Sequence, residues 1–235
     1  MSEDAAKLPV ALVVDDELPM RRFLRAALDG NGYQMVEAAT GEEALREAAM
    51  RSPDIVLLDL GLPDIDGVDV TRRLREWFTA PIVVLSARGQ EGDKIAALDA
   101  GADDYVTKPF AVGELMARMR AALRHRARAG SGEAEAVITA GPLKIDLVKR
   151  VVTRDEAEVH LTALEYKLLS TLARQRGRVM THAQLLREVW GASHVGRNHY
   201  LRVYMAQLRN KLEADPSRPQ VLLTETGVGY RMRDS

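Results

Sequence analysis

The sequence predicts an α/β fold: a doubly wound, five-stranded parallel sheet in a first domain, followed by a smaller second domain. Two observations predict it. Short apolar runs alternate with amphipathic stretches in the first half, whereas the second half has three helical patterns closed by two short β-like segments. The polar, small-residue stretch between the halves lacks apolar periodicity and indicates a linker. We therefore expect domains at 1–124 and 137–235 with a linker at 125–136.

The first half contains five apolar runs, of which the four longer ones are rich in Val, Ile and Leu with little alternation. Strands buried on both faces of a parallel sheet have this composition. The predicted strands are Val10–Val14, Gln34–Ala38, Ile55–Leu58, Ile82–Leu85 and Tyr105–Val106. Helical patterns between them lie near Pro19–Leu28, Glu42–Met50, Val68–Trp77, Lys94–Ala100 and Val112–Arg124.

The second half begins with β-like segments at Leu143–Leu147, Val151–Thr153 and Val159–Leu161. Two of the three helices that follow have capping-box starts, Thr162 with Glu165 and Thr181 with Gln184. The segments Val221–Thr224 and Tyr230–Met232 then form a hairpin around Gly227–Gly229. Helices closed by a terminal hairpin predict a winged helix-turn-helix.

The composition excludes several classes of protein. The chain has 235 residues, 46% of them hydrophobic and 29% charged, which is typical of a soluble globular protein. The absence of cysteine excludes disulfides and thiolate catalysis and fits a reducing compartment. Because no apolar run approaches a membrane span and the N-terminus lacks a signal-peptide pattern, we expect a cytoplasmic protein without membrane insertion. The five histidines show no metal-ligand spacing.

The small net charge of −1 conceals an uneven distribution. Residues 1–136 carry 17 basic and 24 acidic side chains, a net of −7, whereas residues 137–235 carry 16 and 10, a net of +6. A basic half joined to an acidic one indicates that the second half meets a polyanion.

Polar residues follow the predicted strands of the first domain. Ligands of parallel α/β sheets bind at the carboxyl ends of the strands, so these residues are candidates for a site. They comprise three carboxylates, a hydroxyl and an ammonium group: Asp15 and Asp16, Asp59, Ser86, and Lys108. One such aspartate alone would usually cap a turn or helix; five residues at corresponding strand ends favour a shared site.

Three clustered carboxylates repel one another unless a cation is present. Mg²⁺ suits such a site because it prefers carboxylate, carbonyl, water and phosphate oxygens. Asp59 is then placed to attack a phosphorus centre and form an aspartyl phosphate. Mg²⁺, Lys108 and the Ser86 hydroxyl would neutralise charge on the transferring group, which is most of what phosphoryl transfer requires.

Four segments resemble the receiver domain of response regulators: DDE at 15–17, LLDLGLPDIDG at 57–67, VLSAR at 84–88 and AGADDYVTKPF at 100–110. With LTALE at 161–165 and TETGVGYR at 224–231, the chain resembles the winged-helix subfamily of these two-component regulators. DKIAALDAGADDY and HYLRVYMAQLRNKLEADPSRP resemble the regulators of high-affinity potassium-uptake (kdp) operons. This implies a membrane sensor histidine kinase as phosphoryl donor and the promoter of a potassium pump as target.

The resemblance assigns a role to each residue of the pocket. It implies that Asp59 is the phosphoryl acceptor, that Mg²⁺ is held by Asp15, Asp16, Asp59 and the Gly61 carbonyl, and that Lys108 pairs with the phosphoryl group. Pro109 is expected to follow a cis bond. Ser86 and Tyr105 form the expected switch, in which the hydroxyl moves towards the phosphate and the tyrosine turns inward.

The resemblance also implies a homodimer through the fourth helix, fifth strand and fifth helix. The expected interface residues are Lys94, Ile95, Leu98, Asp99, Asp103, Asp104, Glu114, Arg118 and Arg120. Lys94 with Glu114 and Asp104 with Arg118 are the expected pairs between subunits. Considered without the family, these residues are exposed charges whose pairing contributes little.

The stretch 197–212 is basic, contains no acid and predicts the DNA-recognition helix. Its expected core stripe is Leu201, Tyr204, Met205, Leu208 and Leu212. The expected DNA-facing residues are His199, Tyr200, Arg202, Val203, Ala206, Arg209 and Asn210. Arg187, Arg197 and Arg231 are expected at phosphates. Gly191–Arg197 resembles the loop by which the subfamily engages RNA polymerase, although such a segment is otherwise an ordinary turn.

Three alternatives remain at this point. A phosphohydrolase acting on small molecules would need a general acid two residues after the nucleophile, where this chain has Gly61. We therefore expect no enzyme beyond self-catalysed phosphorylation and dephosphorylation. A phosphorylation-independent DNA-binding or scaffold protein with a vestigial receiver is opposed by the intact acidic pair, Asp59, Ser86 and Lys108. A regulator of the same class could also control a different regulon.

Overall fold

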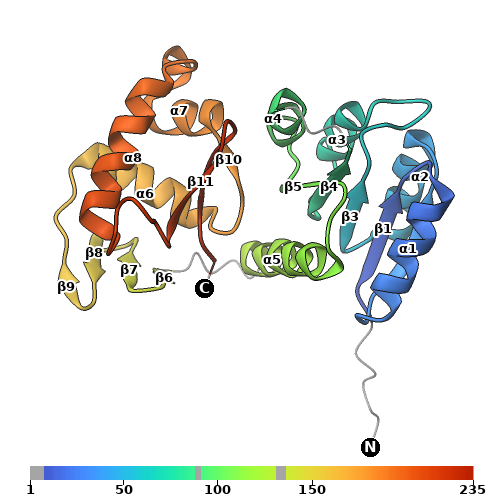
Figure 1. Ribbon diagram of the computed structural model, residues 1–235, viewed down its shortest axis with the longest axis horizontal. Coiled ribbons are helices and arrows are strands. Elements are labelled where there is room, and N and C mark those ends of the chain that lie inside the picture. Colours follow the sequence, from blue (N-terminus) through green and yellow to red (C-terminus); the bar gives the residue numbers. More distant parts are fainter. Residues whose placement is uncertain (1–7, 88–90, 131–135, 235) are drawn as a thin grey trace, which may run out of the picture. The chain divides into compact units, whose positions relative to one another are not determined.

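The computed structural model describes residues 8–87, 91–130 and 136–234 (Figure 1). The chain divides into two compact units, Met1–Arg126 and Ala127–Ser235. Each unit has its own hydrophobic core, so each is described by itself.

The first unit is built on a five-stranded parallel sheet in the order β2-β1-β3-β4-β5. Its strands are β1 (Val10–Val14), β2 (Gln34–Ala38), β3 (Ile55–Leu58), β4 (Ile82–Ser86) and β5 (Asp104–Thr107). Its helices are α1 (Leu18–Asp29), α2 (Gly41–Arg51), α3 (Gly67–Arg75), α4 (Glu91–Asp99) and α5 (Val112–Gly130). The predicted fold class and all five predicted strands are confirmed, with small differences at their ends.

Helices cover both faces of this sheet. Ala11 and Val13 of β1 join a core with residues of α1 and α5, whereas Leu12 and Val14 join a core with residues of α2 and α3. Successive side chains of a strand point to opposite faces, so a strand covered on both sides needs apolar residues at every position. This explains the uninterrupted apolar runs in the sequence.

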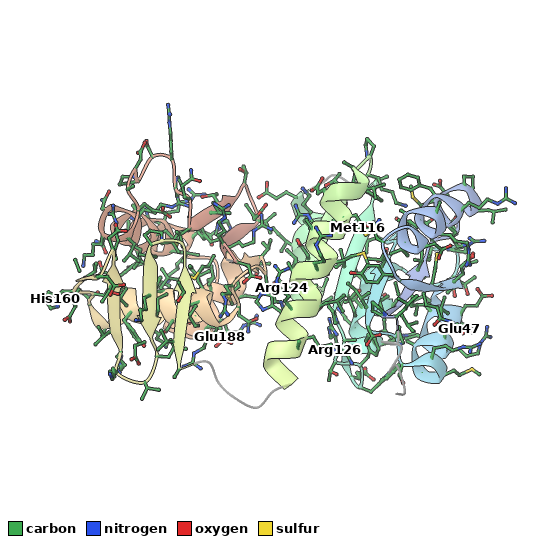
Figure 2. The ribbon with its side chains drawn as sticks, turned by 90° about the horizontal axis from the view of Figure 1, so that it is seen from below. Glu47, Met116, Arg124, Arg126, His160 and Glu188 are labelled. Atoms are coloured by element: carbon green, nitrogen blue, oxygen red, sulfur yellow. The ribbon has the colours of Figure 1, made fainter. Side chains whose placement is uncertain are left out.

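Helix α5 extends beyond the end predicted for it. We expected it to end at Arg124, but it continues to Gly130, so residues 125–130 are helical rather than part of a flexible linker. Arginine and alanine are strong helix formers, and this propensity extends the helix where apolar periodicity is lacking. Arg126, labelled in Figure 2, donates a 3.0 Å hydrogen bond to the carbonyl oxygen of Asp54. Residues 131–135 of the predicted linker lie outside the described residues.

The second unit packs three α-helices with two antiparallel sheets, in the orders β6-β7-β8-β9 and β10-β12-β11. Its helices are α6 (Ala163–Arg174), α7 (His182–Trp190) and α8 (Asn198–Leu212), with the 3₁₀ turn η1 (Ala192–His194). Its strands are β6 (Val137–Ala140), β7 (Leu143–Asp146), β8 (Val151–Arg154), β9 (Ala157–Glu158), β10 (Met180–Thr181), β11 (Leu222–Glu225) and β12 (Gly229–Met232). This arrangement confirms the predicted winged helix-turn-helix.

The strands of the second unit differ from the prediction in three places. The expected strand Val159–Leu161 is wrong, because β9 ends at Glu158 and the side chains of Val159 and Leu161 pack against the core instead. The apolar residues there reflect packing, not pairing. The strands β6 and β10 were not predicted, since their short sequences carry little apolar pattern.

Both predicted capping boxes are present. The Thr162 hydroxyl accepts from the Glu165 amide while the Glu165 carboxylate accepts from the Thr162 amide, and Thr181 and Gln184 do the same at α7. These bonds satisfy amide groups that have no partner inside a helix. None of the helices in the described ranges combines the length and apolar composition needed to cross a membrane.

Candidate functional site

The carboxyl ends of three parallel strands bring two acids and a base together. Strand β1 lies beside β3, and β5 lies beside β4, so Asp15, Asp59 and Lys108 meet at one edge of the sheet. The Lys108 Nζ lies 2.7 Å from Asp15 Oδ2 and 2.9 Å from Asp59 Oδ1. Lys108 thus pairs with Asp15, which lies 93 residues earlier in the chain, and with Asp59, which lies 49 residues earlier. Their positions at the ends of parallel strands predict this meeting.

These groups lie largely out of water. Asp15 is 1% exposed and Asp59 is 8% exposed, so little of either residue is in contact with solvent. Burial lowers the pKa of Lys108, but the hydrogen bonds and negative charges of Asp15 and Asp59 outweigh it, so its pKa lies above the ordinary value. Lys108 is therefore a permanent cation at the pocket.

The remaining pocket residues hold the acceptor and line its rim. The Gly61 amide donates a 2.8 Å hydrogen bond to Asp59 Oδ2, so both carboxylate oxygens of Asp59 have donors. Asp16 and Gly61 are exposed beside it. The peptide bond between Lys108 and Pro109 is cis, as predicted.

The donor chemistry of this pocket fits a hard divalent cation. Across the described part of the chain, no three His, Cys, Asp or Glu side chains gather closely enough to hold a metal by themselves. The pocket nevertheless joins the carboxylates of Asp15 and Asp59 to one ammonium, which leaves one negative charge in excess, and the exposed Asp16 follows Asp15 in the same loop. Oxygen donors together with unbalanced charge are what Mg²⁺ prefers.

The expected switch residues occupy neighbouring strands. Ser86 ends β4 and is 1% exposed, and Tyr105 in β5 is 7% exposed. The Lys94 Nζ lies 5.6 Å from the centroid of the Tyr105 ring, a cation–π distance. The structure thus has Tyr105 already buried, with Lys94 of α4 above it.

Several charges that we expected between subunits are paired within one chain. Arg118 of α5 donates to Asp104 at 2.7 Å and to Glu114 at 3.1 Å, so the expected Asp104–Arg118 pair is internal. Lys94 faces Tyr105 rather than Glu114. These contacts join β5, α4 and α5, so the same charges stabilise the monomer.

Two further expected interface residues are also engaged inside the unit. Asp103 pairs with Arg75 of α3 and accepts a 2.8 Å hydrogen bond from the Ile82 amide, so it lies against α3 and not on an open surface. Leu98 is buried, at 2% exposed, and cannot form the apolar centre of an interface without rearrangement. Of the expected set, Asp99, Glu114 and Arg120 are exposed and Ile95 is partly exposed.

In the second unit, α8 has the two faces that the sequence predicts. Leu201, Met205, Leu208 and Leu212 are buried, and Tyr204 is partly buried against the Trp190 ring. The opposite face exposes His199, Tyr200, Arg202, Val203, Ala206 and Asn210. Arg187 of α7 and Arg197 before α8 are also exposed.

Arg209 is the exception on this helix. Its guanidinium donates to the Leu222 carbonyl oxygen at 2.6 Å and 3.0 Å and to Thr224 Oγ1 at 2.7 Å, which ties α8 to the hairpin. Its Nε and Nη2 therefore donate within the unit, and a role of Arg209 at DNA stays a prediction. Arg231 on β12 pairs with Glu225 at 2.5 Å and is partly exposed.

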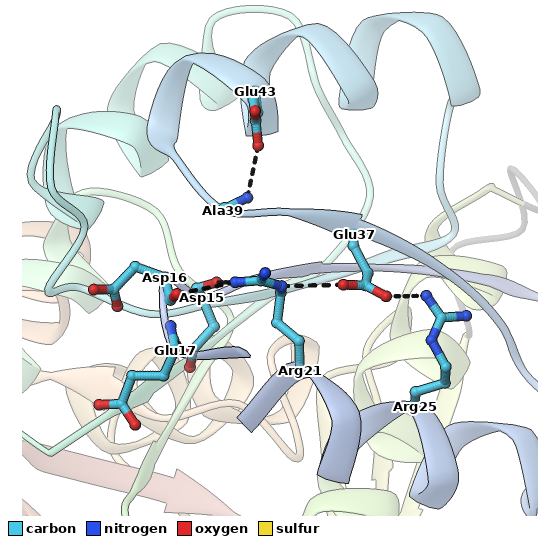
Figure 3. Close-up of polar contacts among 8 residues, drawn as sticks. All are labelled: Asp15, Asp16, Glu17, Arg21, Arg25, Glu37, Ala39 and Glu43. Atoms are coloured by element: carbon cyan, nitrogen blue, oxygen red, sulfur yellow. Dashed lines mark hydrogen bonds and ion pairs between the residues drawn. The ribbon is translucent and has the colours of Figure 1, made fainter. Parts of the chain in front are cut away.

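Sequence reasoning missed Arg21. Its side chain reaches from the second turn of α1 back to the loop that carries Asp15 and Asp16, where it donates to their carbonyl oxygens at 2.7 Å and 3.0 Å (Figure 3). The signal available in the sequence was an arginine five residues after the acidic pair, at the start of a helix. That pattern has no chemical meaning until the loop's path is known.

Comparisons with known proteins agree with this geometry. The response regulator receiver domain family matches residues 11–120, and the family of transcriptional regulatory protein C-terminal domains matches residues 155–232. The chain is 52% identical over 220 residues to the KDP operon transcriptional regulatory protein KdpE of Escherichia coli (strain K12), covering 94% of this chain and 97% of that protein. It is 53% identical over 224 residues to transcriptional regulatory protein KdpE of Mycobacterium tuberculosis (strain CDC 1551 / Oshkosh), covering 95% and 99%.

A solved structure described as a novel family of redox sensors in the streptococci, evolved from two-component response regulators, is also similar. It is 27% identical with a TM-score of 0.50, covering 97% of this chain and 100% of that one. A CheY-like receiver domain protein from Methanospirillum hungatei JF-1 shares the fold of the first half, at 24% identity and a TM-score of 0.51, covering 52% and 99%. The two family models and the two KdpE relatives show that the chain belongs to the two-component response regulators of the winged-helix, OmpR/PhoB type.

Proposed function

We propose that Asp59 accepts a phosphoryl group from a sensor histidine kinase and that this modification controls promoter binding by the C-terminal unit. The observation that carries the proposal is Lys108 Nζ bridging Asp15 and Asp59 at the edge of the sheet. A buried cation beside a nucleophilic carboxylate suits the transfer of a group whose oxygens gain negative charge. The same pocket does not favour a phosphohydrolase of small molecules, because Gly61, two residues after Asp59, offers no general acid.

The chain's own groups account for most of the transfer. An Asp59 carboxylate oxygen attacks phosphorus, a P–O bond forms, and the bond from phosphorus to the donor's leaving group breaks. Lys108 and the Ser86 hydroxyl meet the phosphoryl oxygens. Asp15, Asp16, Asp59 and the Gly61 carbonyl would hold Mg²⁺, which supplies charge neutralisation at those oxygens when bound.

Incubation of the full chain with acetyl phosphate and Mg²⁺ tests this function directly. We expect intact-mass spectrometry to show the addition of one phosphoryl group, and peptide mapping after borohydride reduction to place it at Asp59. Asp59→Asn should remove the modification entirely, because an amide is no nucleophile for this reaction. Unmodified wild-type protein, or modification that persists in Asp59→Asn, would contradict the assignment.

Phosphorylation would reach the dimer surface through Ser86 and Tyr105. The phosphoryl group adds negative charge and acceptor oxygens that the Ser86 hydroxyl can meet. Tyr105 lies on the strand beside that of Ser86 and contacts Lys94 of α4, so the position of its ring bears on α4. We propose that the exposed part of α4 and α5, with Asp99, Glu114 and Arg120, then forms a homodimer in which Arg118 exchanges partners between chains.

The exposed face of α8 is proposed to enter the major groove of promoter DNA, with Arg187, Arg197 and Arg231 at phosphates. Because the relatives carry the name of the KDP operon, we propose a high-affinity potassium-transport promoter as the target. Gly191–Arg197, which includes η1, would engage RNA polymerase, and the protein would act in the cytoplasm.

Arg202→Ala should weaken promoter binding by about tenfold, since one lost arginine contact to DNA costs about 1–3 kcal/mol. Gel-shift titration measures this, and Asp59 of the variant should still be labelled by acetyl phosphate. Arg218→Ala provides the matched control, because it removes the same charge from an exposed turn of the same unit. Equal affinity of the wild type and Arg202→Ala would show that another face of the unit meets DNA.

Two alternatives are separated by the same reagents. A phosphorylation-independent DNA-binding protein would bind the promoter equally well as wild type and as Asp59→Asn, with and without acetyl phosphate. A regulator of a different regulon would respond to phosphorylation but would be absent from potassium-transport promoters when its genomic occupancy is mapped under potassium limitation.

A further inference from the structure

The two aspartates of the loop at 15–17 differ in how their carboxylates are held. The Asp15 carboxylate is held by Lys108 and by the amide of Glu17, at 2.7 Å and 2.9 Å. The Asp16 carboxylate, by contrast, makes no hydrogen bond or ion pair with any described residue, and its side chain is exposed. Among the described residues, the printed contacts of Asp16 are therefore made by its backbone.

Arg21 holds that backbone. Its Nη1 donates to the carbonyl oxygens of both Asp15 and Asp16, at 2.7 Å and 3.0 Å. A carbonyl fixed in this way fixes the peptide planes on which the two carboxylates are mounted. Figure 3 shows the guanidinium lying between this loop and β2.

Arg21 is itself held from the other side. Its Nε donates to Glu37 of β2 at 3.0 Å, and only 14% of its side chain is exposed. Glu37 also pairs with Arg25, one turn further along α1. The hydrogen bond from Arg25, opposed by burial and reinforced by Arg21, lowers the pKa of Glu37, so Glu37 is a fixed anion that anchors the arginine.

We propose that Arg21 is a positioning residue for divalent-cation binding: it orients the Asp15–Asp16 backbone so that both carboxylates face the pocket beside Asp59. The inference rests on the proposed phosphoryl-acceptor function. It differs from a simple charge effect, because a guanidinium near a cation site would weaken metal binding by repulsion. Arg21 instead contributes through the two carbonyl bonds.

The chain provides a matched control. Arg25 lies on the same helix, carries the same charge and pairs with the same Glu37, but it does not contact Asp15 or Asp16. Arg21→Ala and Arg25→Ala therefore remove equal charge and one Glu37 partner each, and only the first releases the loop.

The test is a Mg²⁺ titration of the full chain without a phosphoryl donor. Binding is monitored through the NMR chemical shifts of the pocket amides, including that of Gly61. Arg21→Ala should weaken Mg²⁺ binding by about tenfold, the typical effect of losing a group that orients metal ligands. Arg25→Ala should stay within about twofold of wild type, and Arg21→Lys, which keeps a donor, should fall between.

Three results would overturn the proposal. They are an unchanged Mg²⁺ affinity in Arg21→Ala, equal weakening by Arg21→Ala and Arg25→Ala, and a wild-type chain that binds no Mg²⁺. If Arg21→Ala does not fold, Glu37→Ala replaces it, since it removes the acceptor that ties Arg21 to β2 without changing the loop. For this variant we expect an intermediate loss of Mg²⁺ affinity. An unchanged Mg²⁺ affinity would contradict the proposal. Because no phosphoryl donor is present, failure here is distinct from failure of Asp59 to be modified.

Discussion

Lys108→Ala is expected to slow phosphorylation of Asp59 by acetyl phosphate by about 100-fold, the typical effect of removing one preorganised charged donor from a transition state. In the structure the Lys108 ammonium bridges Asp15 and Asp59, and its place beside the acceptor oxygen is where a phosphoryl oxygen would arrive. The rate constant of phosphorylation is measured at saturating Mg²⁺ by quenching the reaction at set times and determining the phosphorylated fraction by mass spectrometry.

The reduction in phosphorylation rate caused by Lys108→Ala should be constant from about pH 6 to about pH 9. The ordinary lysine pKa is already near 10.4, and the pKa of Lys108 lies higher. The group's stabilising contribution is present below the ordinary pKa and is lost only as the pH rises through the higher folded value. Lys108→Arg separates charge from placement: it should recover part of the rate. A Lys108→Ala rate within about threefold of wild type would show that Lys108 serves the fold rather than the transfer.

Glu165→Ala is expected to destabilise the second unit by about 2 kcal/mol, since it removes a capping bond and a partly buried ion pair together. Glu165 is 2% exposed; its carboxylate accepts from the Thr162 amide and from Lys211 of α8, each at 2.7 Å. The residue thus joins the start of α6 to the recognition helix. Its loss should loosen the helix that we propose binds DNA.

The chain allows this to be measured on one unit. It has two tryptophans, Trp77 in the first unit and Trp190 in the second, so urea unfolding in a Trp77→Phe background follows the second unit through Trp190 fluorescence. Glu165→Gln keeps an acceptor for the Thr162 amide but loses the charge, and should cost about half as much. Equal stability of wild type and Glu165→Ala would contradict the role of the pair.

The pH dependence has a definite sign. Burial raises the pKa of Glu165, but the hydrogen bonds and charge of Lys211 and Thr162 outweigh it and leave the pKa below its ordinary value. A lowered pKa stabilises the folded state above the unfolded value, about 4.3, and this contribution disappears as the pH falls through the folded value. The advantage of wild type over Glu165→Gln should therefore be full at neutral pH and shrink below about pH 5.

Patterns in the sequence were sufficient to predict the parallel sheet, its strands and the pocket at their carboxyl ends. Uninterrupted apolar runs identify strands buried on both faces, and parallel strands place their carboxyl ends together. Asp15, Asp59 and Lys108 therefore had to meet, and they do. The two faces of α8 were also determined, because one helical stripe is apolar and the other is polar.

Which charged side chains form ion pairs or hydrogen bonds could be seen only in the tertiary structure. Arg118 with Asp104, Arg75 with Asp103 and Arg209 with Leu222 of β11 are 14, 28 and 13 residues apart and lie on different elements. Long basic side chains reach several ångströms in many directions, and no local periodicity encodes which neighbour lies within that reach. For the same reason the contact of Arg21 with the loop that carries Asp15 and Asp16 could be recognised only in the folded structure. Burial patterns are local properties of a sequence, whereas charge pairing belongs to the fold.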